Sequence, residues 1–132
     1  MTRYAIDAST ALRVVDDERV VDSKHSLVGP AALRSDVLRL LYREVRAGKR
    51  DAAEGRTRLE ALAALKIRLL GDRVSRATAW RIAAELGWDD TAPAECLAVA
   101  TLQADALVTD DPVLRAGTAD RVRLAEYEDL FR

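Results

Sequence analysis

Residues 92–111, APAECLAVATLQADALVTDD, hold the two patterns that decide the fold of this chain. The first twelve of these residues are apolar nearly all round a helical wheel, which predicts a central and buried helix over 92–103. Residues 104–109 follow as a short apolar strand, which ends at Asp110 and Asp111. A buried helix followed at once by a buried strand is typical of an α/β protein with a parallel sheet.

The same alternation of helices and apolar strands recurs along the rest of the chain. Further strands are expected at 3–6, 26–28, 67–70 and 122–124, and further helices at 8–15, 30–47, 52–65, 74–86 and 112–116. Pro30 is expected at a first helical position, with Asp51 and Thr91 as helix caps. Since right-handed crossovers join parallel strands, we expect an α/β three-layer sandwich with a central, mainly parallel sheet flanked by helices. No linker or repeat interrupts the pattern, which predicts a single domain over 1–132.

Composition supports a folded protein of the cytoplasm. Hydrophobic residues make up 49% and charged residues 33% of the 132 residues, a balance typical of globular domains. The single cysteine, Cys96, has no intrachain disulfide partner, and the N-terminus lacks the apolar run of a signal peptide. The longest uncharged stretch, 96–104, is far shorter than the roughly 18 residues that span a bilayer. We therefore expect a cytoplasmic protein with no membrane segment.

The charges are unevenly distributed although the formal net charge is only −1. Residues 34–81 carry 13 basic and 6 acidic side chains, whereas residues 82–132 carry 4 basic and 11 acidic ones. The basic segment predicts phosphate attraction, and part of it is also explained by solvated helix faces with pairs such as Glu54–Arg58. The side chains in this segment that we expect to contact RNA are Arg39, Arg43, Arg46, Lys49 and Arg50. Aromatic residues are only 5%, which argues against an extended base-stacking platform.

Three aspartates are candidates for a common site. Asp7 and Asp111 each follow an apolar strand, and the carboxyl ends of parallel strands lie at the edge of the sheet where ligands bind. Asp36 borders the apolar stripe of its helix, where an unpaired charge is costly to bury. A cation shared with the other two aspartates would neutralise it, and so would an ion pair with Arg39 or Arg43.

The chemistry of these three side chains points to a hard divalent cation. All of their ligand atoms are oxygens, which favours Mg²⁺ or Mn²⁺ over zinc. Such ions usually accept phosphate oxygens of the substrate as further ligands. The pattern therefore predicts metal-assisted cleavage of phosphodiester bonds.

Histidine-driven and thiol-driven hydrolases are disfavoured. The only histidine, His25, falls in a polar stretch that predicts a solvated loop, and an acid–base pair of histidines is therefore excluded. Cys96 falls on the apolar helix, where an inert core cysteine is expected. No nucleophile elbow or phosphate-binding glycine loop is present.

In its motifs the chain resembles the PIN-domain nucleases, in particular the VapC-type toxins of toxin–antitoxin pairs. The resemblance is carried by residues 6–9 (IDAS), 30–38 (PAALRSDVL) and 107–111 (LVTDD), in that order and spacing. It implies a parallel sheet flanked by helices, an acidic Mg²⁺ or Mn²⁺ pocket and endoribonuclease activity on RNA. It also implies a homodimer and a small cognate antitoxin protein.

By position, the resemblance assigns roles to individual residues. Asp7, Asp36 and Asp111 match the family's metal-binding and catalytic acids, with Asp36 standing where the family usually has glutamate. Ser9 and Thr109 match hydroxyl positions that orient a carboxylate or a water.

One position departs from the family pattern. Pro93 stands where the family usually carries an aspartate at the start of the buried helix, and proline offers no side-chain ligand. Glu95 on that helix and Asp90 just before it are the candidates to replace the missing acid. The alternative is a catalytically attenuated PIN-like module that binds RNA or protein.

Overall fold

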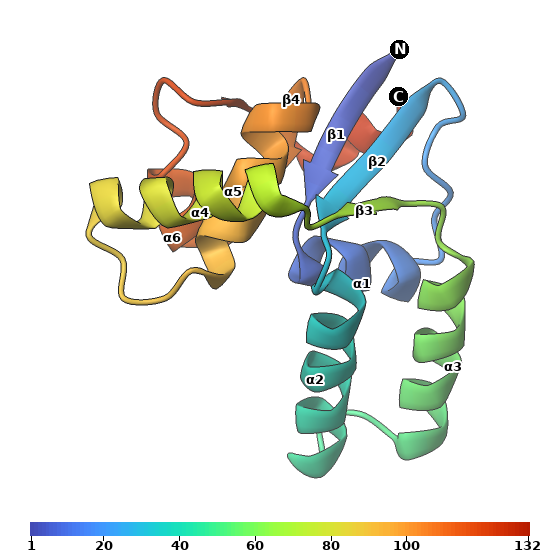
Figure 1. Cartoon of the computed structure of the whole chain (residues 1–132). Helices are drawn as coiled ribbons and strands as arrows, with labels where there is room; N and C mark the ends of the chain where they lie inside the picture. Colours follow the sequence, from blue (N-terminus) through green and yellow to red (C-terminus); the bar gives the residue numbers. More distant parts are fainter.

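Five short apolar runs form the strands of one parallel sheet. The computed structural model describes residues 1–132, and its strands are β1 (Thr2–Ile6), β2 (His25–Pro30), β3 (Arg68–Leu70), β4 (Ala106–Val108) and β5 (Arg123–Leu124). Their order across the sheet is β3-β2-β1-β4-β5, and all four pairings are parallel. The chain starts in the middle of the sheet and adds strands on both sides, so β1 lies between β2 and β4 (Figure 1).

The α-helices occupy the connections between the strands, and a 3₁₀ helix follows β5. They are α1 (Ala8–Asp16), α2 (Leu33–Arg46), α3 (Ala52–Ala64), α4 (Arg73–Leu86), α5 (Ala92–Gln103), α6 (Pro112–Ala116) and the 3₁₀ helix η1 (Tyr127–Phe131). Asp51 caps α3 as predicted, because its carboxylate accepts the N–H groups of Ala53 and Glu54. Gly87 ends α4 in the left-handed conformation that glycine adopts without strain (φ 68°).

Side-chain alternation along the strands gives the sheet two apolar faces. Tyr4, Ile6 and Val108 belong to one core cluster, with side chains from α1, α2, α3 and η1. Ala5 and Leu107 belong to a second cluster, which is built mainly from α4 and α5. Because successive residues of a strand point to opposite faces, the sheet is covered by helices on both sides. The predicted α/β three-layer sandwich with a parallel central sheet is confirmed.

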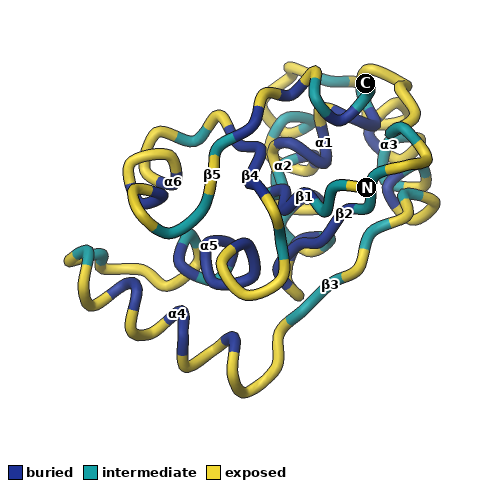
Figure 2. Tube along the Cα trace, turned by 90° about the horizontal axis from the view of Figure 1, so that it is seen from above, coloured by how far each residue is buried: buried dark blue, intermediate teal, exposed yellow.

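The middle of helix α5 is deeply buried. Ala94, Leu97 and Ala98 have no exposed surface, residues 96–100 are buried without interruption, and residues 101–103 at the end of α5 are exposed (Figure 2). Helix α4 lies outside it and alternates between buried and exposed residues. The apolar sequence 92–103 therefore forms the central helix that its composition predicted. No helix has both the length and the apolar character needed to cross a bilayer.

Three local predictions are wrong. Pro30 does not start a helix: it is the last residue of β2 and pairs with Leu70, and α2 begins three residues later. Thr91 makes no capping hydrogen bond, whereas the Asp90 carboxylate accepts the Ala92 N–H at 3.1 Å.

His25 is not in a solvated loop. It opens β2, its ring packs edge-on against Tyr4 with centroids 5.1 Å apart, and its Nε2 lies 3.0 Å from the Arg132 carbonyl oxygen. For Pro30 and His25 the local pattern was outweighed by contacts with residues distant in the sequence, whereas at Thr91 the neighbouring aspartate takes the capping role.

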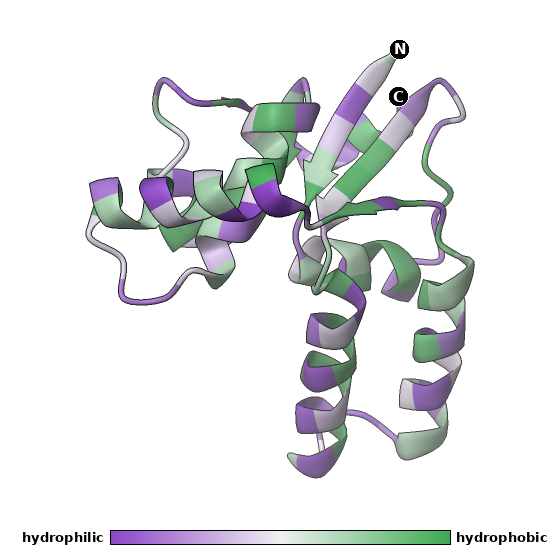
Figure 3. Cartoon of the chain, in the orientation of Figure 1, coloured by the Kyte–Doolittle hydropathy of each residue, from purple (hydrophilic) through white to green (hydrophobic).

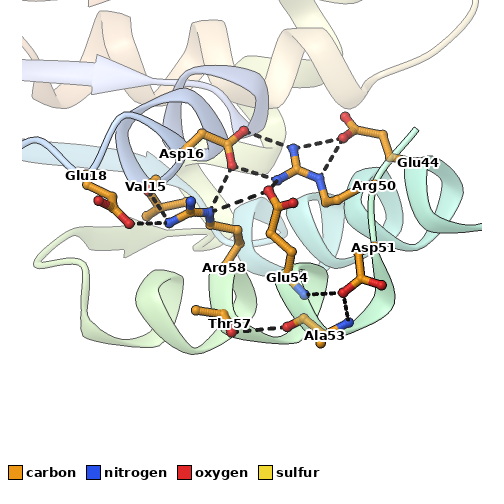
Figure 4. Close-up of polar contacts among 10 residues, drawn as sticks. All are labelled: Val15, Asp16, Glu18, Glu44, Arg50, Asp51, Ala53, Glu54, Thr57 and Arg58. Carbon is orange, nitrogen blue, oxygen red and sulfur yellow. Dashed lines mark hydrogen bonds and ion pairs between the residues drawn. The ribbon is translucent and has the colours of Figure 1, made fainter. Parts of the chain in front are cut away.

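The largely buried side chain of Arg50 forms ion pairs with acids of three helices. Its guanidinium is only 10% exposed and donates to Asp16 of α1 at 2.7 and 2.9 Å and to Glu44 of α2 at 2.9 Å (Figure 4). Glu54 of α3 lies 3.2 Å away. The hydrogen bonds to Asp16 and Glu44 raise the pKa of Arg50, because they stabilise its charged form. The expectation that Arg50 contacts RNA is therefore wrong: its donors are used within the fold.

Replacing Arg50 by methionine is expected to destabilise the protein by about 1 to 3 kcal/mol, because three carboxylates lose their common partner. Urea unfolding followed by circular dichroism measures this as a lower midpoint at unchanged slope. Arg81→Met is the matched control, since Arg81 is 64% exposed and lies 3.8 Å from its only partner, Glu85. An equal change in both variants would contradict the structural role of Arg50.

Candidate functional site

Asp7 stands at the carboxyl end of β1 and at the start of α1. Its backbone is extended (φ −94°, ψ 177°), and its side chain caps α1. Carboxylate Oδ1 accepts the Thr10 N–H at 3.1 Å and the Thr10 hydroxyl at 2.6 Å. This carboxylate is therefore fixed by the first turn of the helix that follows it.

The Thr109 hydroxyl links Asp7 to the next strand. Thr109 follows β4 directly, and β4 pairs with β1 so that Ile6 and Val108 are partners. Its Oγ1 donates to Asp7 Oδ2 at 2.6 Å and accepts the Asp111 N–H at 3.0 Å. Thr109 is 2% exposed, so this hydrogen-bonded link between the two strand ends is shielded from water. Oδ1 of Asp7 already accepts two hydrogen bonds from Thr10, whereas Oδ2 retains a lone pair that the Thr109 hydroxyl does not use.

Asp111 begins α6 at the same edge of the sheet. Its Oδ1 accepts the Val113 N–H at 2.9 Å, whereas its Oδ2 makes no hydrogen bond within the chain. Arg115 of α6 donates to the Thr109 carbonyl oxygen at 2.8 Å and so holds the turn between β4 and α6. The neighbouring Asp110 points elsewhere: its side chain is 81% exposed and pairs with Arg13 at 3.3 Å.

The Cys96 thiol is buried close to the ends of β1 and β4. Cys96 of α5 is 3% exposed, and its Sγ lies 3.8 Å from the Ile6 carbonyl oxygen. Burial raises the pKa of this thiol, and the negative charges of Asp7 and Asp111 raise the pKa further. Both carboxylates therefore act on one buried group beneath the sheet edge, and Cys96 has the surroundings of the inert core cysteine that was expected.

Asp36 lies in the first turn of α2, which follows β2 at the same sheet edge. Its side chain is 34% exposed and accepts a hydrogen bond from Arg39 at 2.9 Å. Of the two interpretations from the sequence, the ion pair with Arg39 is the one observed. Nowhere in the chain do three or more acidic, cysteine or histidine side chains gather as a metal-binding cluster. The structure thus brings Asp7 and Asp111 together and leaves Asp36 turned toward Arg39.

The residues considered as replacements for the missing acid have different surroundings. Pro93 occupies the first turn of α5. Asp90 is exposed and serves as a cap of that helix. Glu95 is half-buried, its side chain makes no hydrogen bond or ion pair, and it directly precedes Cys96, which lies under the site. Glu95 is therefore the one of the two whose carboxylate is free of other contacts.

Thr10 was missed by the sequence analysis, which named Ser9 instead. Ser9 is exposed and makes no hydrogen bond, whereas Thr10 is 5% exposed and donates to Asp7. A signal was available: an N-cap aspartate accepts from the residue three positions later, and a threonine there brings its hydroxyl to the same oxygen.

The basic residues near the site differ in how far they are already paired. Arg39 is bound to Asp36, whereas Arg43 and Arg46 are exposed and form no ion pair. Asp36, Arg39, Arg43 and Arg46 all belong to α2, which runs away from the sheet edge (Figure 1).

Comparisons with known proteins show what the chain is similar to. No family model matches the sequence, and no curated protein does. The structure of PAE2754 from Pyrobaculum aerophilum covers 98% of this chain and 92% of its own, with a TM-score of 0.72 and 24% identity. The structure of VapBC2 from Rickettsia felis, bound to a DNA fragment from its promoter, matches with a TM-score of 0.66 and 8% identity. The match covers 94% of this chain and 98% of the other. At these identities the matches show a common fold, and they confirm the predicted PIN-like fold class.

We expect Cys96 to resist thiol reagents in the folded protein, because it is buried and its raised pKa leaves almost no thiolate at neutral pH. Labelling with a chromogenic disulfide reagent at pH 7.5 should be negligible in buffer and stoichiometric in denaturant. Rapid labelling of the native protein would contradict the placement of this thiol under the two aspartates.

Proposed function

We propose that this protein is a metal-dependent endoribonuclease, in which Asp7 and Asp111 hold Mg²⁺ or Mn²⁺ and an RNA phosphodiester is hydrolysed. The observation that carries the proposal is the Thr109 hydroxyl, which ties the Asp7 carboxylate to the backbone of Asp111 at the carboxyl edge of the sheet. In open parallel sheets this edge is where ligands bind.

The donor set fits the proposed ion. Mg²⁺ is commonly held by one or two carboxylates, with waters and substrate phosphate oxygens completing its shell. Asp7 and Asp111 provide two carboxylates with unused lone pairs and no nitrogen or sulfur donor among them. Asp36 would join as a third ligand after leaving Arg39, and Glu95 has a carboxylate with no competing partner.

When bound, the ion would supply a more acidic water and neutralise charge on the phosphate. The chain's own residues would do the rest. Thr10 and Thr109 keep the Asp7 carboxylate in one orientation, which limits the rearrangement that binding requires. Release of Asp36 would free Arg39 to contact the phosphate. In-line attack of water would leave a 5′-phosphate and a 3′-hydroxyl.

We further propose that the protein is a toxin of a toxin–antitoxin pair, acting in the cytoplasm as a homodimer and restrained by a small cognate antitoxin. The motif resemblance to VapC-type toxins and the fold shared with VapBC2 support this assignment. Eight per cent identity supports it through the fold alone.

The second candidate is an attenuated PIN-like module that binds RNA or protein without cleaving. Two observations favour it: Pro93 occupies the position of the family's aspartate, and Asp36 is paired with Arg39 instead of joining the other carboxylates. Cleavage assays separate the two candidates directly.

Purified protein is expected to cleave a labelled single-stranded RNA only with Mg²⁺ or Mn²⁺ present. Asp7→Asn should lower the rate at least about a hundredfold, because asparagine still caps α1 but lacks the charge that binds the ion. Asp111→Asn should lower the cleavage rate to a similar extent. Gel analysis of the products should show 5′-phosphate ends.

Asp110→Asn is the matched control, since Asp110 neighbours Asp111 but points to solvent. It should keep nearly full activity. Metal-independent cleavage, or equal rates for wild type and Asp7→Asn, would overturn the nuclease proposal. Binding of RNA with no cleavage under any metal would favour the second candidate.

A further inference from the structure

The outward face of α2 carries an exposed tyrosine among arginines. Tyr42 is 64% exposed and Leu38 is 50% exposed, which is unusual for large apolar side chains on a helix that packs against its neighbours. The 3.6-residue period places Leu38, Arg39, Tyr42 and Arg46 along one side of the helix, with Arg43 beside them. These five residues are called the Tyr42 stripe below. Hydrophilic bands recur along α2 in Figure 3.

The ring of Tyr42 has no partner within the chain. The other aromatic rings of this protein that lie beside arginines are covered: Arg13 lies 3.7 Å from the centroid of Tyr127, and Arg19 lies 3.6 Å from that of Phe131. No arginine and no second ring lies against Tyr42, although arginines flank it in the sequence. Its faces are therefore open for stacking by a ligand.

Two of the three arginines in the Tyr42 stripe, Arg43 and Arg46, have no compensating carboxylate. The acids nearest to it on α2 are already paired, Asp36 with Arg39 and Glu44 with Arg50. Arg43 and Arg46 form no ion pair with any carboxylate. An open aromatic face beside two free guanidinium groups complements a strand that alternates bases with phosphates.

The Tyr42 stripe begins in the first half of α2, close to the end of the helix that lies at the sheet edge. Asp36 is in the first turn of α2, at the sheet edge that holds Asp7, and the helix runs outward from there (Figure 1). With 1.5 Å of rise per residue, Tyr42 lies about 9 Å further along the helix axis than Asp36. A strand bound on the stripe would thus run along α2 toward the sheet edge that holds Asp7.

We propose that the Tyr42 stripe binds single-stranded RNA, with one base stacked on Tyr42 and phosphates held by Arg43 and Arg46. The proposal rests on the proposed nuclease function and deepens it by naming where the substrate lies. Single-stranded RNA is required, because bases inside an A-form duplex are already stacked and cannot reach a tyrosine. A helical protein partner fits less well, since such partners need apolar anchors over about two turns and the stripe offers only Leu38 and Tyr42.

The test is binding of a fluorescent single-stranded oligoribonucleotide, measured by anisotropy in EDTA so that cleavage plays no part. Tyr42→Ala is expected to weaken binding about tenfold or more, whereas Tyr42→Phe should stay within about twofold because the stacking surface remains. Arg43→Gln and Arg46→Gln should each reduce the slope of log K against log salt by about 0.7, a change that Tyr42→Ala should not make.

Trp80→Ala is the matched control for loss of an exposed aromatic ring. Trp80 is 75% exposed on α4, where Arg81 is paired with Glu85 and Arg76 donates to the Gly71 carbonyl oxygen. It should leave RNA affinity unchanged. Equal weakening by Trp80→Ala and Tyr42→Ala would overturn the assignment to α2. Unchanged RNA affinity in Tyr42→Ala would also overturn this assignment, and would favour a protein partner for the Tyr42 stripe.

The two proposals fail separately. If wild type cleaves RNA with metal and Tyr42→Ala binds RNA as tightly as wild type, the stripe proposal is wrong and the nuclease proposal stands. If Tyr42→Ala loses affinity while no metal produces cleavage, the stripe proposal is supported and the nuclease proposal is wrong.

Discussion

The hydrogen bond from Thr109 to Asp7 is the interaction on which the candidate site depends. Two strands that run in parallel bring Asp7 and Asp111 to the same edge, where their like charges repel. The Thr109 hydroxyl, shielded from solvent, binds the Asp7 carboxylate on one side and the Asp111 backbone on the other. Together with Thr10 it donates to both oxygens of Asp7. The N-terminus of α1 adds a favourable dipole to the same carboxylate.

The rest of the fold holds this edge in place. The two apolar clusters fix the sheet from both faces, so β1 and β4 cannot shift register without exposing one core. Cys96 fills the space behind the aspartates with a small group that stays neutral. On the far side of the sheet, Arg50 ties α1, α2 and α3 through Asp16, Glu44 and Glu54 and so fixes the direction in which α2 leaves the site.

The sequence allowed the sheet to be predicted from its short apolar runs, and the Asp7–Asp111 pair from the two runs that end at acids. Other features depend on contacts that no local pattern records. Pro30 has the sequence of a helix start but pairs with Leu70 from a strand forty residues later. A helical wheel places Asp36 at the border of the buried face, yet it does not say whether a cation or Arg39 takes its charge.

Arg50 could not be predicted for the same reason, because its local sequence indicates a solvent-exposed basic residue between two helices. Its burial is created by carboxylates from three separate elements, and only the assembled structure brings them together. Thr10 is a different case. Thr10 is only three residues after Asp7, and the capping rule identifies it once Asp7 is recognised as the N-cap of a helix.

The role of the Thr109 hydroxyl in a cation site is tested most directly by the rise in melting temperature that Mn²⁺ produces. This rise is compared in wild type, Thr109→Ser and Thr109→Val. Serine keeps the hydroxyl that orients Asp7, and valine removes it at nearly the same volume. We predict a clear stabilisation by Mn²⁺ for wild type and Thr109→Ser and a much smaller one for Thr109→Val, since losing such an outer contact typically weakens metal affinity about 10- to 100-fold. Equal stabilisation of all three proteins, or none in wild type, would contradict a cation site organised by Thr109.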